Sequence, residues 1–327
     1  MIQPVLGIDI AKDTFDAALI VADQTWNEHF ENNANGFKHM SRWIGKHTHE
    51  EVHACMEATG QYGDGLAEYL YQQGNQVSVV NPARIKAYAS SKLRRNKTDK
   101  ADAQLIAEYC LREKPVLWSP PPASFKGLQA LVRRLEDLQA NYYQENNRLQ
   151  SGGINQVVNE GIKDHLHYLD EKIDQIKQAI QEHIEAYPEL KYRQKLLVSI
   201  PGIGQLTAAK ILGEVRDVCE FDGARQLAAY AGVTPRNFLS GTSVHKKSRL
   251  SKMGNSQLRK ALYMPAIVAQ THNPIIRTFS QRLLKSGLRP MEVIGAAMHK
   301  LLHLIYGILK SGKPFDPDFL QKQDVSS

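Results

Sequence analysis

The chain has 327 residues, 42% of them hydrophobic and 23% charged, with a net charge of +7 (41 basic minus 34 acidic residues), a composition that excludes extensive disorder and allows two or three folded domains. Its cysteines, Cys55, Cys110 and Cys219, are far apart and have no zinc-ligand spacing, which argues against a disulfide framework and a structural zinc site. Because no N-terminal signal segment and no apolar run of about eighteen residues is present, we expect a cytoplasmic protein with no membrane partner.

The first region, residues 1–120, alternates short strands with amphipathic helices. Three strands are expected in succession, at 5–10, 14–22 and 26–32, with turns of hairpin length between them. They are followed by a helix at 36–46, a strand at 51–56, a helix at 62–73, a strand at 76–80 and a helix after Pro82. This order, βββαβαβα, predicts an α/β domain whose mixed sheet has helices on both faces, as in the ribonuclease H type of fold.

The second region, residues 121–190, is predicted to be two long amphipathic helices. Leucines from Leu128 to Leu138 recur at spacings of three and four, and so do the apolar residues from Ile162 to Ile184. A break is expected near 151–153, where Ser-Gly-Gly occurs. The two helices can form an antiparallel hairpin or a dimerising coiled coil, and the periodicity does not distinguish these arrangements.

The third region, residues 191–327, is predicted to be mainly helical. It opens with SIPGIG, in which Gly202 and Gly204 separate one helix from another that begins near Gln205. This resembles a helix-hairpin-helix, whose glycines let the backbone approach a phosphate and whose second helix offers N-terminal amides; an ordinary Pro-Gly turn is the alternative. Helices are also expected at 226–231, 257–270, 274–285 and 291–310, with a basic loop at 234–253.

Four acids have the placement that a two-metal nuclease needs. Asp9 lies inside the apolar run VLGIDI and Glu57 ends HACME, and a carboxylate in a hydrophobic strand is costly to desolvate unless it is neutralised. Asp99 and Asp102 follow the N-cap residue Thr98 and point the same way from a first helical turn. Four such carboxylates can hold two Mg²⁺ ions against a phosphate. The helical pair can alternatively serve only the helix dipole.

Two segments carry many cations and no acid, namely 83–98 and 223–291. Clusters of this kind suit the backbone phosphates of a nucleic acid, with little dependence on base sequence. A solvated cationic face is the alternative. The candidate nucleic-acid-binding residues are Arg84, Lys86, Lys92, Arg94, Arg95, Lys97, Gly202, Gly204, Arg236, Lys246, Lys247, Arg249, Lys252, Arg259 and Lys260.

Motifs along nearly the whole chain resemble the DEDD transposases of the insertion sequence 110 family. They are GIDIAK, MEATG, VVNPARIKAYA, RRNKTDKADA, SIPGIG, YAGVTPRNFLSGTS, SKMGNSQLRKALYMPA and LKSGKPFD. The resemblance implies a RuvC-like domain at 1–120, a coiled-coil region at 121–190 and a C-terminal transposase domain at 191–327. It also implies that Asp9, Glu57, Asp99 and Asp102 hold Mg²⁺, with Mn²⁺ as an alternative.

The same resemblance implies a serine recombinase. It places the nucleophile on Ser240, in LSGTS, although the residues alone do not distinguish Ser240 from Ser243, Ser248 or Ser251. A phosphoserine would conserve the phosphodiester energy for religation. The partners implied are donor and target DNA, a structured non-coding guide (bridge) RNA, and further copies of the chain, as a homodimer that becomes a tetramer on DNA. A bacterial protein associated with the nucleoid when active is expected.

Two other functions fit the same residues. A RuvC-like junction resolvase or nuclease would use water as the nucleophile in place of Ser240. An architectural nucleic-acid-binding protein would bind without the four acids and cleave nothing. A tyrosine recombinase is disfavoured, because Tyr142, Tyr143 and Tyr263 lie in helical patterns with no Arg-His-Arg set around them.

Overall fold

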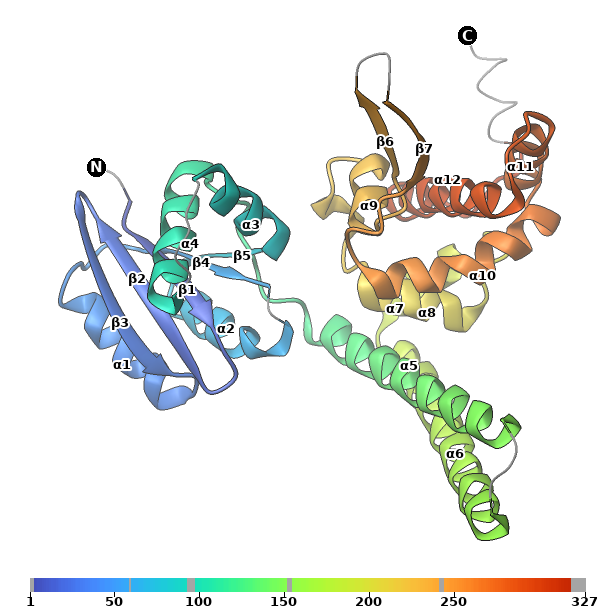
Figure 1. Ribbon diagram of the computed structural model, residues 1–327, viewed down its shortest axis with the longest axis horizontal. Helices are drawn as coiled ribbons and strands as arrows, with labels where there is room; N and C mark the ends of the chain where they lie inside the picture. The colour runs from blue at the N-terminus through green and yellow to red at the C-terminus, as the bar shows by residue number, and fades with distance from the viewer. Residues whose placement is uncertain (1–2, 59, 93–97, 152–154, 241–243, 319–327) are drawn as a thin grey trace. The chain divides into compact units, whose positions relative to one another are not determined.

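The computed structural model describes residues 3–58, 60–92, 98–151, 155–240 and 244–318 (Figure 1). Of Gln61 and of residues 236–240 and 244–249, the structure describes the backbone and not the side chains. The chain divides into two compact units, Met1–Pro120 and Pro121–Ser327, and each is described by itself.

The first unit is built on a five-stranded mixed sheet with the order β3-β2-β1-β4-β5. The first three strands pair antiparallel, and β1, β4 and β5 pair parallel. The predicted order of elements is therefore confirmed, with two strands at the predicted bounds and the other three shifted by one or two residues at their ends. The strands are β1 (Val5–Ile10), β2 (Thr14–Val21), β3 (Gln24–Glu31), β4 (His53–Glu57) and β5 (Gln76–Val80).

Helices cover both faces of this sheet, as predicted. Leu6, Ile8 and Met56 share one buried cluster with residues of α1 and α2. Val5 and Cys55, which alternate with them along β1 and β4, share another with residues of α3 and α4. The helices are α1 (Ala34–Gly45), the 3₁₀ turn η1 (Gly60–Tyr62), α2 (Asp64–Gln72), α3 (Pro82–Ser91) and α4 (Asp99–Glu113).

The second unit begins with the long helices α5 (Ala123–Gln150) and α6 (Gln156–Ala186), which lie side by side in Figure 1. Their predicted apolar faces meet, since Leu135, Leu138, Leu169 and Ile173 belong to one buried cluster. Within this chain the two helices therefore form an antiparallel hairpin, here called the stalk. Whether they also dimerise stays a prediction.

The body of the second unit is mainly helical, and its large core is continuous with the stalk. The predicted turn at PGIG does join two helices, and the helix expected at 274–285 has the predicted bounds. The helices are α7 (Pro188–Val198), α8 (Gln205–Glu214), the 3₁₀ turn η2 (Val218–Glu220), α9 (Ala224–Tyr230), α10 (Ser256–His272), α11 (Pro274–Lys285) and α12 (Pro290–Ser311).

Within the described part of the chain, α12 alone is long and apolar enough to match a membrane span by length and composition. Its buried face, which includes Leu301 and Ile305, packs in the helical core. This is the pattern of a core helix.

The prediction of a basic loop at 234–253 is wrong. The segment forms a two-stranded antiparallel hairpin of β6 (Pro235–Ser240) and β7 (Val244–Leu250). Its cations concealed the strand signal in the sequence, which was two short runs with apolar or β-branched residues, such as Phe238 and Val244, on either side of Gly241. Leu250, the last residue of β7, packs over Gly295 of α12.

Candidate functional site

Asp9 and Glu57 end up beside one another at the carboxyl edge of the parallel strands. The register of β1 and β4 pairs Ile8 with Met56, and the next residue along each strand is one of the two acids. Each has the same parity as the residues that face α3 and α4, so both carboxylates project on that face of the sheet. Both side chains are half-buried.

The helix α4 directs Asp99 and Asp102 toward the same edge. Its last turns lie near the start of β4, where the Cys110 thiol donates to the carbonyl of His53 over 3.8 Å. Its middle crosses β1 in backbone contact, because a Cβ at Gly7 would lie 2.2 Å from the carbonyl oxygen of Ala103. The helix therefore runs opposite to β1 and β4, and its first turn lies toward the carboxyl ends of both strands.

The acid edge, defined as Asp9, Glu57, Asp99 and Asp102, has the chemistry of a site for a hard cation. Carboxylate oxygens are the ligands that Mg²⁺ prefers, and two strands and one helical turn supply them here. Thr98 also caps α4, with its Oγ1 accepting from the backbone N–H of Ala101 at 3.2 Å. Among the described residues, no three His, Cys, Asp or Glu side chains lie close enough to hold a metal ion. The metal site therefore stays a prediction.

Beneath the acid edge the sheet carries buried polar groups that the sequence analysis did not assign. The His53 ring bonds to the Ser78 hydroxyl at 2.9 Å. A hydrogen bond with Cys110, together with burial, raises the pKa of the Cys55 thiol. Cys55 is therefore neutral at physiological pH. We infer that His53, Ser78 and Cys55 stabilise the position of β4.

The basic segment 83–98 contains cations that are exposed and one, Lys92, that contacts other residues of its own unit. Arg84 and Lys86 are exposed on α3. Lys92 is half-buried, with its Nζ 3.8 Å from a carboxylate oxygen of Glu108 and 5.6 Å from the ring centre of Tyr88. Arg94, Arg95 and Lys97 lie outside the described residues. Lys92 thus has contacts within its own unit, and its role in nucleic-acid binding stays a prediction.

The two glycines of PGIG differ in what requires them. Gly202 has a left-handed φ of 105°, and a Cβ there would lie 3.0 Å from the carbonyl of Pro265 in α10. Gly204 has open space around it and begins α8 with no side-chain cap. Gly202 is therefore explained by packing, whereas the first amides of α8, just beyond Gly204, have no hydrogen-bond partner among the described residues and could bind an acceptor.

Ser240 is the last residue of β6 and pairs with Val244. The backbones of Arg236, Lys246, Lys247 and Arg249 lie on the same hairpin, whose side chains are outside the described structure. Beyond β7, Lys252 and Lys260 are exposed. Arg259 is partly engaged, because its Nη1 donates to the carbonyl of Ala231 at 3.0 Å.

A buried acid at the root of this hairpin was missed from the sequence. Glu214, at the end of α8, is 6% exposed. Its carboxylate accepts from Arg133 Nε of the stalk at 3.2 Å and from Asn255 Nδ2 at 2.7 Å. The same amide nitrogen of Asn255 donates to the hydroxyl of Tyr230 at 3.1 Å.

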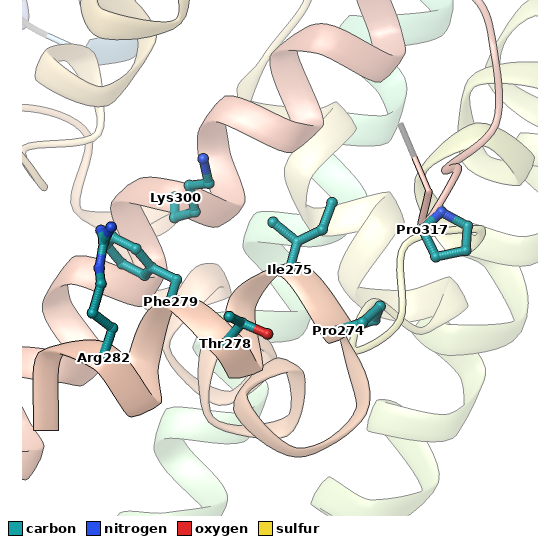
Figure 2. Close-up of a pocket in the computed structure, with 7 residues that line it drawn as sticks. All are labelled: Pro274, Ile275, Thr278, Phe279, Arg282, Lys300 and Pro317. Carbon is teal, nitrogen blue, oxygen red and sulfur yellow. The ribbon is translucent and has the colours of Figure 1, made fainter. Parts of the chain in front are cut away.

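A pocket of about 350 Å³ lies between α11 and α12. Figure 2 shows Phe279 and Arg282 beside one another on α11 and Lys300 on α12. The Arg282 guanidinium lies 5.6 Å from the ring centre of Phe279. The remaining described residues that line it are mostly apolar, and none of them is an acid. Two cations over an apolar floor can accept an anionic group, and neither was among the predicted binding residues.

Comparison with known proteins assigns both halves of the chain. Residues 6–152 match a family model described as a transposase, and residues 194–281 match one described as the transposase IS116/IS110/IS902 family. The pilin gene-inverting proteins of Moraxella lacunata and Moraxella bovis are 37% and 38% identical, over 97% of this chain and 98% of each relative. The transposase for insertion sequence element IS1111A of Coxiella burnetii is 26% identical, over 79% of this chain and 75% of its own.

Proposed function

The chain belongs to the insertion sequence 110 family of transposases and is a DNA transposase or recombinase, and from this premise we propose that it acts by a serine mechanism assisted by Mg²⁺. In this proposal Ser240 attacks the scissile phosphate, and Asp9, Glu57, Asp99 and Asp102 hold the metal. What supports it is that β1 and β4 end side by side at Asp9 and Glu57 and that the first turn of α4 lies toward the same edge, in a chain whose other unit carries Ser240 on the hairpin of β6 and β7.

The acid edge would serve the reaction by holding Mg²⁺ close to the scissile phosphate. Mg²⁺, when bound, neutralises phosphate charge and polarises the phosphorus. Asp9 and Glu57 are fixed by the strands that carry them, and Asp99 and Asp102 by the contact of α4 with β1. A bound cation would offset the negative charge of these four side chains.

Ser240 would act as the nucleophile. Its Oγ forms a bond to phosphorus as one bridging P–O bond breaks, and the serine proton is passed on so that the departing oxygen leaves as a hydroxyl. The phosphoserine keeps the number of phosphodiester bonds constant, so a DNA hydroxyl can later displace the serine without ATP. Cleavage and rejoining would then be one reversible exchange, which suits inversion, the reaction named in the pilin gene-inverting relatives.

The remaining parts are assigned by the same proposal. Residues 1–120 would be a RuvC-like domain of the ribonuclease H type, 121–190 a coiled-coil region and 191–327 the transposase domain. Within the last of these, α7 and α8 would form a helix-hairpin-helix that binds DNA. Arg84, Lys86 and Lys260 would contact the backbones of DNA or of a guide RNA, because base pairing with an RNA leaves the protein only backbones to hold. Assembly as a dimer, and as a tetramer on DNA, would bring acids and serines of several copies to the junction.

A covalent-trapping assay tests the mechanism. Labelled DNA carrying the junction of the element, with its RNA and Mg²⁺, is incubated with wild type, Ser240→Ala or Asp102→Ala and run on a denaturing gel. We expect a protein–DNA adduct in the wild type only, because each variant lacks either the nucleophile or a metal ligand. Cleaved ends that persist in Ser240→Ala would instead identify a nuclease that uses water. DNA binding with no cleavage under any condition would indicate an architectural protein.

A further inference from the structure

The hairpin of β6 and β7 has its two ends joined at one polar cluster. Tyr230 ends α9 just before the hairpin, and Asn255 caps α10 just after it. The backbone N–H of Asn255 donates to the Tyr230 carbonyl at 2.6 Å, and its Nδ2 donates to the Tyr230 hydroxyl at 3.1 Å. Gly254 packs against the same carbonyl so closely that a Cβ would lie 2.2 Å from it. The segments that precede β6 and follow β7 are therefore bonded to each other.

Glu214 connects this root to the stalk. Its side chain is 2% exposed and is 3.2 Å from Arg133 Nε of α5, while its other oxygen accepts from Asn255 Nδ2 at 2.7 Å. A carboxylate in this position is costly to bury unless its hydrogen bonds are satisfied, so the cluster is held to one arrangement. Arg133 and Glu214 are 81 positions apart in the sequence and Glu214 and Asn255 are 41 apart.

We propose that Glu214 is a positioning residue for strand exchange, which, through Asn255, aligns the hairpin that carries Ser240 with helix α5 of the stalk. This inference rests on the proposed role of Ser240. A change in the direction of α5 would be transmitted through Arg133 and Glu214 to both ends of the hairpin. The stalk would thus orient the nucleophile in addition to any part it has in assembly.

A second contact between the same two helices makes a matched control. Lys210 of α8 bonds to Glu136 of α5. Among the described residues, neither of these two side chains takes part in the hydrogen bonds that join Glu214, Asn255 and Tyr230. Glu136→Gln weakens the attachment of α8 to the stalk and leaves the root intact. Any effect of that attachment alone would appear in this variant too.

The test exchanges the donor and the acceptor between Asn255 and Glu214. Asn255→Asp keeps the helix cap, because aspartate accepts from the Leu258 amide as asparagine does, but it places a carboxylate against Glu214. The double variant Asn255→Asp with Glu214→Gln restores one donor, one acceptor and the original net charge.

We expect adduct formation at saturating DNA to slow about tenfold or more in Asn255→Asp, in line with loss of a hydrogen bond to a charged group, and to recover in the double variant. Glu136→Gln should keep the wild-type rate, and DNA affinity should change less than about twofold in all three.

Hydrogen exchange gives a readout that does not depend on the chemistry. The amides of Ser251 and Lys252 donate to the carbonyls of Thr234 and Gly232 at the root, at 2.9 and 3.0 Å. They should exchange faster in Asn255→Asp, return to the wild-type rate in the double variant and be unchanged in Glu136→Gln. Absence of an adduct in the wild type would reject the serine mechanism. The positioning role would be rejected by unaltered exchange in Asn255→Asp, by a double variant that behaves like the single one, or by an equal loss in Glu136→Gln.

Discussion

The two units hold their proposed catalytic groups in opposite ways. The acid edge rests on a five-stranded sheet, with α4 in backbone contact with β1 at Gly7. Ser240 lies instead on a two-stranded hairpin, and isolated hairpins of this kind have little stability of their own. One site is positioned by a helix packed on the sheet, and the other by contacts at the root of the hairpin, namely the polar bonds of Asn255, the close approach of Gly254 to Tyr230 and the packing of Leu250 on α12.

This difference matters for a reversible exchange. A metal site needs ligands at fixed distances, which a packed sheet and helix supply. A nucleophile that must attack one strand and later release another benefits from an element that can be reoriented. The bonds of Glu214 and Asn255 would supply a defined resting orientation for the hairpin without rigidity along its length.

The largest expected effect comes from inserting a methyl group between α4 and β1. In Gly7→Ala the new Cβ would lie 2.2 Å from the Ala103 carbonyl oxygen and from the Ala107 nitrogen, and backbone atoms cannot move aside as a side chain can. We expect the first unit to lose at least about 3 kcal/mol of stability, the upper part of the range for overpacking, and adduct formation to be abolished. Thermal unfolding followed by circular dichroism measures the first effect.

Gly45→Ala is the matched control for this substitution. Gly45 ends α1, and a Cβ there would meet nothing within 4 Å. Its replacement should change stability by no more than about 1 kcal/mol, the difference in helix propensity. Equal melting points for the two variants would contradict the close packing of α4 on β1.

A smaller effect, the stabilisation of the protein by Mg²⁺, distinguishes the role of the acid edge from that of Ser240. If the acid edge binds Mg²⁺, a concentration about ten times the Kd should stabilise the protein by about 1.4 kcal/mol. Asp9→Asn should lose this stabilisation and Ser240→Ala should keep it, because Ser240 belongs to the other unit. Differential scanning calorimetry with and without Mg²⁺ measures it, and retention of the effect by Asp9→Asn would count against the acid edge as the metal site.

Sequence patterns predicted the first unit well because its signals are local. The apolar runs of β1 and β5 marked those strands, and Thr98 marked the start of α4. Strand parity, together with the place of the fourth strand beside the first in a ribonuclease H type of sheet, is enough to expect Asp9 and Glu57 to be neighbours. The consequence of Gly7 was overlooked, although a glycine inside a strand is a signal of close backbone approach.

The second unit was harder to predict because its site depends on distant contacts. The cations of β7 concealed a strand, and nothing near Glu214 in the sequence indicates that its carboxylate is buried. Its partners, Arg133 and Asn255, lie far along the chain on either side. An acid at the end of a helix is usually exposed, so only the packing of α5, α8 and α10 reveals its role.

The smallest expected effect concerns the pH dependence of the stability of the second unit, through the half-buried His303 of α12. Burial, helped by His299, Lys300 and Arg225, lowers the pKa of His303, so the folded state favours the neutral ring. The unfolded chain binds a proton at its ordinary pKa of about 6.5, and stability is therefore lost as the pH falls from there toward the lowered value. His303→Leu cannot titrate and removes a ring nitrogen, Nε2, that has no hydrogen-bond partner among the described residues.

The difference in melting temperature between pH 7.5 and pH 5.5 should accordingly shrink in His303→Leu, by less than about 2–4 °C, the shift that 1 kcal/mol produces in a unit of this size. His167→Gln, on the exposed face of the stalk, should keep the wild-type difference. An unchanged pH dependence in His303→Leu would show that acid loosens the second unit elsewhere. A reduced dependence would locate an acid-sensitive part of the second unit in α12.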